Sequence, residues 1–367
     1  MIPYGRQSID KKDIVAVSAV LKSDWLTQGP KVLEFEKALA KYCSAKFAVA
    51  VSSGTAALHL AYSVAGIGEG DEVITTPNTF VATTNMLLVV GAKPVFCDIR
   101  LDIYNLDKNE IEKLITKKTK AIVPVHFAGQ PCEMDVILKI AKKYGLLVIE
   151  DACHALGAKC KNKKIGSISD MTIFSFHPVK SVTTGEGGAV LTNNKNFYKK
   201  LILLRSHGVV KDKKGFNVMT ALGYNYRLTD IQAALGISQL KKLDKFIQKR
   251  HQAVELYEKY LVSNKNIILP KELTENCSAW HLYVIRTKSE KTRLPLYNFL
   301  KKNGVGVNFH YPPVYSQPYY RKNGYENISL PNAELYNETA ITIPLFADIS
   351  EKEIKYVSGK INKFFNG

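Results

Sequence analysis

The chain has 367 residues, of which 46% are hydrophobic and 23% are charged, as in ordinary globular proteins. This length predicts about two domains and a core large enough to need neither disulfides nor a structural metal. No apolar run reaches the ~18 residues that cross a bilayer, and the first residues lack the apolar core of a signal peptide. We therefore expect a cytoplasmic protein with no membrane partner.

The formal net charge is +18, from 51 Lys and Arg residues against 33 Asp and Glu residues. Such an excess is found in proteins that bind polyanions, but a solvated lysine-rich surface produces it as well. The lysines are spread along the chain without an arginine-rich stretch or a nucleic-acid motif, so we expect no nucleic-acid partner. The six cysteines form no CxxC pair, which predicts reduced thiols and no metal site.

Helical and strand patterns alternate from about residue 10 to residue 240. Apolar residues at helical spacing predict helices at 10–21, 32–42, 56–64, 79–90, 109–115 and 134–144. Short apolar runs predict buried strands at 47–51, 72–75, 93–97, 121–124, 146–149, 171–176 and 189–191. This alternation is typical of a mainly parallel sheet covered on both faces, so we predict an α/β fold.

A long helical pattern follows, from residue 229 to about residue 262, with Thr229 as its N-cap. A helix of this length often joins two domains. Beyond it the sequence predicts a smaller α+β unit, with a strand at 279–286, a helix at 294–303, a strand at 305–310 and a final helix at 350–365. We therefore divide the chain into a large domain with an N-terminal arm, 1–240, and a small C-terminal domain, 241–367.

The first candidate site motif is the turn 52–55, which joins a predicted strand to a helix and contains Gly54 and Thr55. Small residues at such a turn leave backbone N–H groups free at the helix N-terminus, where the helix dipole favours a phosphate. A Ser or Thr there is also a common N-cap without any ligand. Alone, the turn indicates a phosphate site only weakly.

The second motif ends the predicted strand 146–149 with Glu150 and Asp151, and His154 follows three residues later. Ligands of α/β sheets bind beyond the carboxyl ends of the strands. A carboxylate there can keep a pyridinium nitrogen protonated, which makes a cofactor an electron sink. Asp151 could equally cap a following helix, and a lone histidine such as His154 is more often structural.

The third motif lies beyond the predicted strand 171–176, where Ser175 is followed by a turn of hydroxylated residues and glycines that contains Lys180. A lysine enclosed in a site can have a lowered pKa, and its neutral amine can then form an imine. The alternative is a surface lysine, but this turn carries few other charges.

The fourth motif, 222–236, precedes the long helix and contains Asn225 and Arg227. Arg227 either binds a phosphate or carboxylate through two hydrogen bonds or is a buried structural arginine.

In order and spacing, these four motifs resemble those of the DegT/DnrJ/EryC1/StrS sugar aminotransferase family, and the resemblance covers nearly the whole chain. It includes Leu26-Thr-Gln-Gly29 near the start and Asn308-Phe-His-Tyr311 near the end. The resemblance implies the type I fold of transferases that depend on pyridoxal 5'-phosphate (PLP), and PLP itself as the cofactor. The runs 174–180 and 281–283 look most like those of the pseudaminic acid pathway transaminases.

Carried over residue by residue, the resemblance implies specific roles. Lys180 forms the Schiff base with PLP, Asp151 pairs with the pyridine nitrogen, and His154 lies near the phenolic oxygen. The other implied contacts are phosphate binding by Gly54, Thr55 and Ser175, stacking on the ring by Phe80, binding of the neighbouring subunit's phosphate by Asn225 in a homodimer with shared sites, and contact with the sugar nucleotide by Thr27, Arg227, His310 and Tyr311.

The implied reaction moves an amino group from L-glutamate, leaving 2-oxoglutarate, to C4 of a UDP-linked 4-keto-6-deoxy-N-acetylhexosamine. The UDP-4-amino-4,6-dideoxy sugar would enter pseudaminic acid or a related surface glycan. One alternative is a C4 or C3 aminotransferase for another nucleotide sugar, since the loop 211–220 lacks the tryptophan expected in the closest relatives. Others are a sugar 3-dehydratase, in which a histidine typically replaces the lysine, and a non-catalytic regulatory protein. Lys180 argues against the dehydratase, and the intact set of Lys180, Asp151, Ser175 and Asn225 argues against the regulatory protein.

Overall fold

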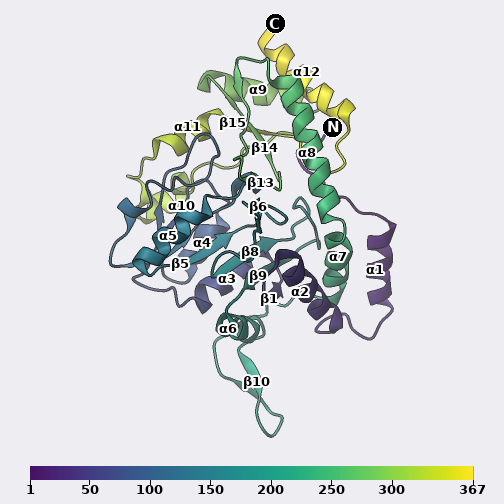
Figure 1. Ribbon diagram of the computed structural model, residues 1–367, viewed down its shortest axis with the longest axis vertical. Helices are drawn as coiled ribbons and strands as arrows, with labels where there is room; N and C mark the ends of the chain where they lie inside the picture. Colours follow the sequence, from purple (N-terminus) through teal and green to yellow (C-terminus); the bar gives the residue numbers. More distant parts are fainter. Residues whose placement is uncertain (367) are drawn as a thin grey trace.

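The computed structural model describes residues 1–366 and has an elongated form, with a large sheet in the middle of the molecule (Figure 1). The seven strands of this sheet lie in the order β1-β9-β8-β5-β4-β2-β3, and only β9 runs antiparallel to its neighbours. The mainly parallel α/β sheet predicted from the sequence is therefore confirmed. The strands are β1 (Phe47–Val51), β2 (Glu72–Thr75), β3 (Lys93–Phe96), β4 (Thr119–Val123), β5 (Leu147–Asp151), β8 (Met171–Ser175) and β9 (Gly188–Thr192).

Helices cover both faces of the sheet, and successive strand residues point into two separate cores. Within β8, Ile173 belongs to one core and Phe174 to the other, as the alternation of side chains along a strand requires. The Phe174 face packs against α2 (Pro30–Cys43), α5 (Met134–Tyr144) and α7 (Asp230–Leu240). The Ile173 face packs against α3 (Gly54–Val64), α4 (Ala82–Val89) and α6 (Lys195–Arg205).

A second, smaller unit follows α7 and has its own apolar core. Its antiparallel sheet has the order β12-β14-β15, and three helices pack against it. The elements are β12 (Ile267–Ile268), β14 (Tyr283–Thr287), β15 (Ala340–Ile343), α8 (Leu243–Leu261), α9 (Glu290–Lys302) and α12 (Glu351–Asn366). The division into domains 1–240 and 241–367 stays a prediction.

The predicted long helix is two helices, α7 and α8, interrupted at Lys241 and Lys242. Leu240 and Leu243 are both buried, so the three-residue apolar spacing continues across the interruption and hides it from a sequence pattern. Thr229 is confirmed as the N-cap, because its side chain accepts a hydrogen bond from Gln232 and the two residues form a capping box.

Two predicted elements were wrong. The stretch 109–115 contains only the short 3-10 helix η1 (Glu112–Leu114), because the backbone becomes extended at Ile115, although Ile111, Leu114 and Ile115 all pack on the core. The stretch 305–310 is not a strand. Val305 bridges to Ile2 while Asn308 bridges to Thr342, and pairing with two different segments prevents a continuous ladder.

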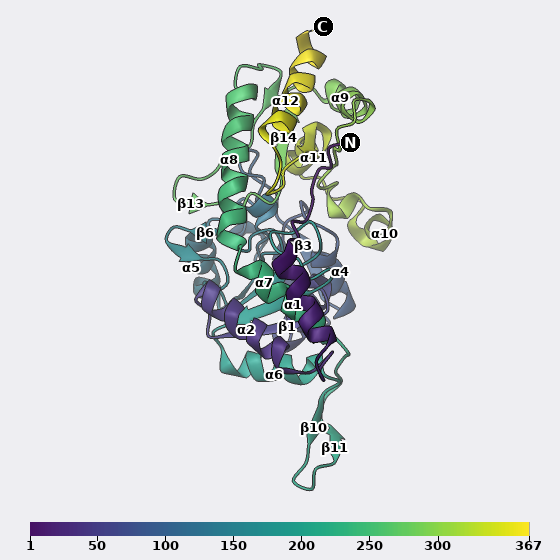
Figure 2. The same cartoon turned by 90° about the vertical axis from the view of Figure 1, so that its right-hand side faces the viewer.

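Several segments lie outside the two main sheets. The hairpin of β10 (Val209–Lys211) and β11 (Asn217–Met219) projects from the molecule beside α6 (Figures 1 and 2). The N-terminal residues run beside the small unit before α1 (Lys11–Leu21) packs on α7 (Figure 2). The remaining short elements are β6 (Lys159–Cys160), β7 (Lys163–Lys164), β13 (Asn276–Cys277), η2 (Phe127–Gly129), η3 (Val314–Ser316), α10 (Pro318–Tyr320), η4 (Arg321–Tyr325) and α11 (Pro331–Thr339).

Among residues 1–366, none of the helices has the length and apolar character needed to cross a membrane.

Candidate active site

A cavity of about 540 Å³ lies beyond the carboxyl ends of the parallel strands, where α/β sheets bind their ligands. It collects side chains from both the large sheet and the small unit. Of the residues singled out from the sequence, nine line it: Gly54, Thr55, Phe80, Asp151, His154, Ser175, Lys180, His310 and Tyr311.

One end of the cavity is the N-terminus of α3. Ser53 is the N-cap, and its hydroxyl accepts a hydrogen bond from the N–H of Ala56 (3.1 Å). Gly54 and Thr55 form the first turn, in which N–H groups lack helical partners and attract anions. The Ser175 hydroxyl at the end of β8 faces the same space. Backbone and hydroxyl donors therefore converge as a phosphate requires.

Glycines let the backbone close tightly around this end. A Cβ atom on Gly188 would lie 2.5 Å from the carbonyl carbon of Ser53 and 2.7 Å from the nitrogen of Gly54. A Cβ on Gly54 would lie 3.1 Å from that of Ser175. Strand β9 can therefore approach the α3 N-terminus only because residue 188 has no side chain.

Asp151, the last residue of β5, is buried and held from two sides. The Thr83 hydroxyl donates to its Oδ2 atom (2.6 Å), and the N–H of Cys153 donates to its Oδ1 atom (3.1 Å). These donors fix the direction of the carboxylate. Asp151 does not cap a following helix, because the residues that come directly after it form turns.

Lys180 lies in the turn between β8 and β9, and its backbone N–H donates to the carbonyl of His177 (2.9 Å). Burial lowers the pKa of Lys180 below its ordinary value, although the nearby Cys153 and Asp151 act in the opposite direction. A lowered pKa increases the fraction of neutral amine, which is the form that attacks a carbonyl.

His154 contacts both units of the molecule. The N–H of Ala128 donates to its Nδ1 atom (3.3 Å), and its Nε2 atom lies 3.4 Å from the Tyr311 hydroxyl. Burial, with the nearby charge of Lys180, puts the pKa of His154 well below 6.5. The ring is therefore neutral at physiological pH, and its free proton is on Nε2, facing Tyr311.

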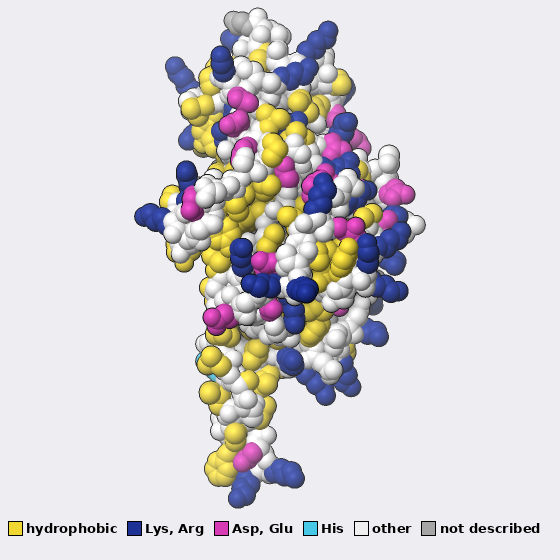
Figure 3. Space-filling view, turned by 90° about the vertical axis from the view of Figure 1, so that its left-hand side faces the viewer, with side chains coloured by type: hydrophobic (Ala, Val, Ile, Leu, Met, Phe, Trp, Pro, Cys, Tyr) yellow, Lys and Arg dark blue, Asp and Glu magenta, His cyan; other side chains and the backbone are white. Residues whose placement is uncertain are grey.

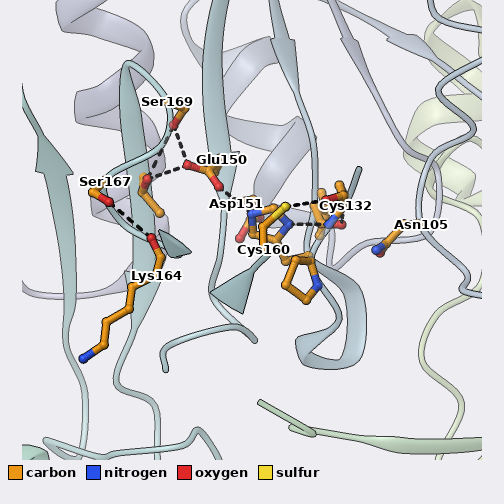
Figure 4. A network of polar contacts seen from close by, with 12 residues as sticks. Asn105, Cys132, Glu150, Asp151, Cys160, Lys164, Ser167 and Ser169 are labelled. Atoms are coloured by element: carbon orange, nitrogen blue, oxygen red, sulfur yellow. Dashed lines mark hydrogen bonds and ion pairs between the residues drawn. The ribbon is translucent and has the colours of Figure 1, made fainter. Parts of the chain in front are cut away.

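A buried network lies beside Asp151 (Figure 4). Glu150 has no exposed surface, and its carboxylate accepts hydrogen bonds from Ser169 (2.6 Å) and Thr172 (2.8 Å) and lies 2.7 Å from His126 Nε2. The N–H of Cys132 donates to the other nitrogen of His126 (3.0 Å). The ring proton of His126 is therefore on Nε2, which donates a hydrogen bond to Glu150. This network ties the ends of β4 and β5 together.

Three of the predicted residues do not line the cavity. Thr27 and Asn225 are exposed to solvent, and Arg227 lines a second, smaller cavity of about 250 Å³ beside Gln28 and Arg205. Within one copy of the chain, none of the three is grouped with Lys180.

The structure adds cavity residues that the sequence analysis did not select, among them Tyr4, Thr83 and His281. Thr83 lies 68 positions from its partner Asp151, and Tyr4 comes from the N-terminal arm. Thr83 lies one helical turn after Thr79, but nothing in the local sequence links Thr83 to Asp151.

A further group of possible metal ligands, His251, Glu272 and Cys277, has its donor atoms within 4.8 Å of one another. Two of these side chains already bond to the backbone of Ser278. The N–H of Ser278 donates to Glu272, and its carbonyl oxygen lies 2.9 Å from His251 Nε2. These hydrogen bonds explain why the side chains lie together, because they hold the turn at Ser278 in place.

The main cavity fits PLP. It offers an anion-binding helix end at Gly54 and Thr55, a buried and oriented carboxylate at Asp151, and an amine of lowered pKa at Lys180. PLP carries a phosphate, a basic ring nitrogen and an aldehyde, which are the groups complementary to these three features.

Comparison with known proteins agrees with this geometry. Residues 7–362 match the model of the DegT/DnrJ/EryC1/StrS aminotransferase family. The UDP-4-amino-4,6-dideoxy-N-acetyl-beta-L-altrosamine transaminase of Campylobacter jejuni subsp. jejuni serotype O:23/36 is 44% identical over 97% of this chain and 96% of its own length.

Two solved structures are similar along their whole length. Helicobacter pylori PseC, an aminotransferase involved in the biosynthesis of pseudoaminic acid, has a TM-score of 0.96 and 36% identity, and the match covers 99% of each chain. Spr1654 from Streptococcus pneumoniae, assigned as a sugar aminotransferase and solved in its PLP form, has a TM-score of 0.94 and 32% identity, covering 99% of this chain and 98% of that chain.

Proposed function

This chain belongs to the DegT/DnrJ/EryC1/StrS aminotransferase family and is a PLP-dependent sugar aminotransferase, and we propose that it transfers the amino group of L-glutamate to C4 of a UDP-linked 4-keto-6-deoxy-N-acetylhexosamine. The product is a UDP-4-amino-4,6-dideoxy sugar for pseudaminic acid or a related surface glycan. The names of the Campylobacter and Helicobacter relatives support this substrate class. The observation that carries the chemistry is the meeting of Lys180, Asp151 and the α3 N-terminus in one cavity.

We assign the roles of the cavity residues as follows. Gly54, Thr55 and Ser175 hold the phosphate through backbone and hydroxyl donors, and Phe80 lies on the ring face. Asp151 holds a proton at the ring nitrogen, and Thr83 keeps its carboxylate in place. When bound, PLP supplies an electron sink for the negative charge that develops at the substrate carbon.

Proton transfer falls to Lys180 in this proposal. Its neutral amine takes the proton from the α-carbon of L-glutamate as general base and delivers a proton as general acid. His154 is neutral and bonds to the Ala128 N–H, so it can hold an oxygen of the cofactor by a hydrogen bond without adding a charge. The same residues act in reverse order when the keto sugar accepts the amino group.

We also propose a homodimer with shared active sites. Asn225, Thr27 and Arg227 then serve the partner's cavity, which accounts for their place outside the cavity of their own copy. The β10–β11 hairpin supports this arrangement, because large apolar side chains on and beside it are exposed, including Phe216 (67%), Met219 (66%) and Leu222 (74%). Figure 3 shows hydrophobic side chains on the projecting hairpin and across the middle of the same face. Apolar area of this kind marks an interface.

The substrate assignment is tested with a panel of UDP-keto sugars that differ in the position of the carbonyl, C3 or C4, and in ring configuration. The enzyme is supplied with PLP and L-glutamate, and products are identified by mass spectrometry and NMR, with Lys180→Ala as the inactive control. Amination of a 4-keto-6-deoxy-N-acetylhexosamine is expected. Amination of a 3-keto sugar alone, or of no sugar, contradicts the assignment.

A further inference from the structure

His281 is a cavity residue to which no role has been assigned, and it enters the cavity from the segment that leads into β14. Its side chain is buried, with 4% of the residue exposed, and its ring centroid lies 4.4 Å from that of His154. The two imidazoles therefore form one continuous part of the wall.

Both units of the molecule fix the backbone of His281. Its N–H donates to the carbonyl of Ala128 (2.8 Å), the residue whose N–H binds His154. Its carbonyl accepts a hydrogen bond from Nη1 of the buried Arg250 on α8 (3.3 Å), which also binds the carbonyl of Trp280 (3.1 Å). A residue whose backbone is fixed from two sides is well placed to orient a ligand.

The ring of His281 is neutral, and one of its nitrogens is in a dry environment. Burial, with the charge of Lys180, puts the pKa of His281 well below 6.5. Its Nδ1 atom is buried without a hydrogen-bond partner among residues 1–366. A buried N–H without an acceptor is costly, so the single proton belongs on Nε2, the atom free to serve the cavity. His281 thus presents an N–H donor.

The part of the wall formed by Asn308, His310 and Tyr311 is also uncharged. Burial lowers the pKa of His310 to about 4, and the amide of Asn308 and the hydroxyl of Tyr311 are further polar groups of the cavity. Among the described residues that line the cavity, Lys180 is the one Lys or Arg. Neutral N–H and O–H groups suit the hydroxyl and carbonyl oxygens of a sugar ring, whereas carboxylates favour cationic partners.

We propose that His281 is a substrate-binding residue of the sugar half of the reaction, donating its Nε2–H to an oxygen of the keto-sugar ring; this inference rests on the proposed function. One hydrogen bond of this kind changes binding or rate by about tenfold. L-Glutamate does not depend on this hydrogen bond, because this part of the wall offers no cationic partner to its two carboxylates.

The test measures the two half-reactions separately, with wild-type enzyme, His281→Phe and His281→Gln. Phe keeps a flat ring but removes the donor, whereas the Gln amide places an N–H near the position of Nε2. We expect His281→Phe to lower the rate with the keto sugar about tenfold and to weaken binding of the amino-sugar product, measured by calorimetry, to a similar extent. The rate with L-glutamate should change less than about twofold, and His281→Gln should restore most of the loss.

Equal losses in both half-reactions, or a His281→Phe enzyme as fast as wild type with the keto sugar, would overturn the proposal. Product binding that is unchanged in His281→Phe would overturn it as well. Failure of the proposed function looks different, because the wild-type enzyme itself then gives no reaction with L-glutamate or with the 4-keto sugar. Near-ultraviolet circular dichroism identifies a variant that has lost its fold. If His281→Phe is such a variant, the test is whether His281→Gln keeps most of the wild-type rate with the keto sugar.

Discussion

At the scale of single residues, the carboxylate of Asp151 depends on one side-chain donor, the hydroxyl of Thr83 at 2.6 Å. A charged hydrogen-bond acceptor loses more than a neutral one when its donor is removed, and the carboxylate is buried. The orientation of the Asp151 carboxylate therefore depends on the hydrogen bond from Thr83 as much as on its place at the end of β5.

We predict that Thr83→Val weakens PLP binding about tenfold, because Val keeps the shape of the side chain but cannot donate to Asp151. The dissociation constant is measured by titrating PLP and following its absorbance. Thr83→Ser keeps the hydroxyl and should bind nearly as wild type does. A Thr83→Val protein with wild-type affinity would show that the hydroxyl does not position the carboxylate.

Glu150 gives a pH-dependent prediction. Burial raises the pKa of Glu150, but hydrogen bonds from His126, Ser169 and Thr172 outweigh it and leave the pKa below the ordinary 4.5. Because the folded-state pKa lies below the unfolded one, the carboxylate stabilises the fold fully above pH 4.5, and this stabilisation is lost as the pH falls through the folded-state pKa.

Glu150→Gln should therefore reduce the free energy of unfolding by roughly 1–3 kcal/mol at neutral pH, and the difference from wild type should shrink in acid. Urea unfolding of both proteins across the pH range measures this difference. A difference that stays constant down to the lowest pH at which both proteins fold contradicts the proposed ionised network.

At the scale of elements, the approach of β9 to α3 gives the clearest prediction. In Gly188→Ala the new Cβ would lie 2.5 Å from the Ser53 carbonyl, so β9 or the α3 N-terminus must shift. We expect a loss of roughly 1–3 kcal/mol in unfolding free energy together with weaker PLP binding, measured by denaturation and by PLP titration.

Gly359→Ala is the matched control, because its Cβ meets nothing within 4 Å in α12. It should leave PLP binding unchanged and add up to about 1 kcal/mol of stability. If Gly188→Ala binds PLP as well as the control does, the close contact at Ser53 is not part of the phosphate site.

Elements with continuous apolar runs were predictable from the sequence, and elements defined by distant partners were not. Strand 72–75 and helix 134–144 have the predicted bounds, because burial on the sheet dictates their residues. The β10–β11 hairpin was missed since its residues are exposed and lysine-rich. The apolar residues of 305–310 predict a strand, but Val305 bridges to the N-terminal arm and Asn308 bridges to β15.

The same distinction applies to the site. Asp151 and Lys180 follow apolar strands and stand out in the sequence, and the structure groups them in one cavity. Thr83 and His281 contribute through contacts with residues 68 and 127 positions away, respectively, which no local motif records. The functional roles of the site residues stay predictions.

At the scale of the whole molecule, the proposed homodimer has a specific consequence. If Asn225 serves the partner's site, Lys180→Ala and Asn225→Ala each inactivate a dimer of identical copies. A mixed dimer of the two variants has one site with both defects and one with neither. Mixing the two inactive proteins and allowing exchange should therefore recover about a quarter of wild-type activity.

The recovered activity is measured with L-glutamate and the keto sugar, and the dimer is checked by sedimentation. Mixing Lys180→Ala with Asp151→Ala is the control, since both defects lie in the same copy's cavity and every site of the mixed dimer has one of them. No recovery above this control, with exchange demonstrated, places Asn225 in its own copy's site or outside the site altogether.

The central claim is that Lys180 and its cavity carry out PLP-dependent transamination. The most direct test is the absorbance spectrum of the purified protein with PLP, before and after L-glutamate is added, for wild type and Lys180→Ala. The account predicts a visible band in the wild type that shifts to the near ultraviolet with L-glutamate, and no such conversion at a comparable rate in Lys180→Ala. A wild-type protein that binds no PLP, or binds it and responds to no amino donor, would contradict the account.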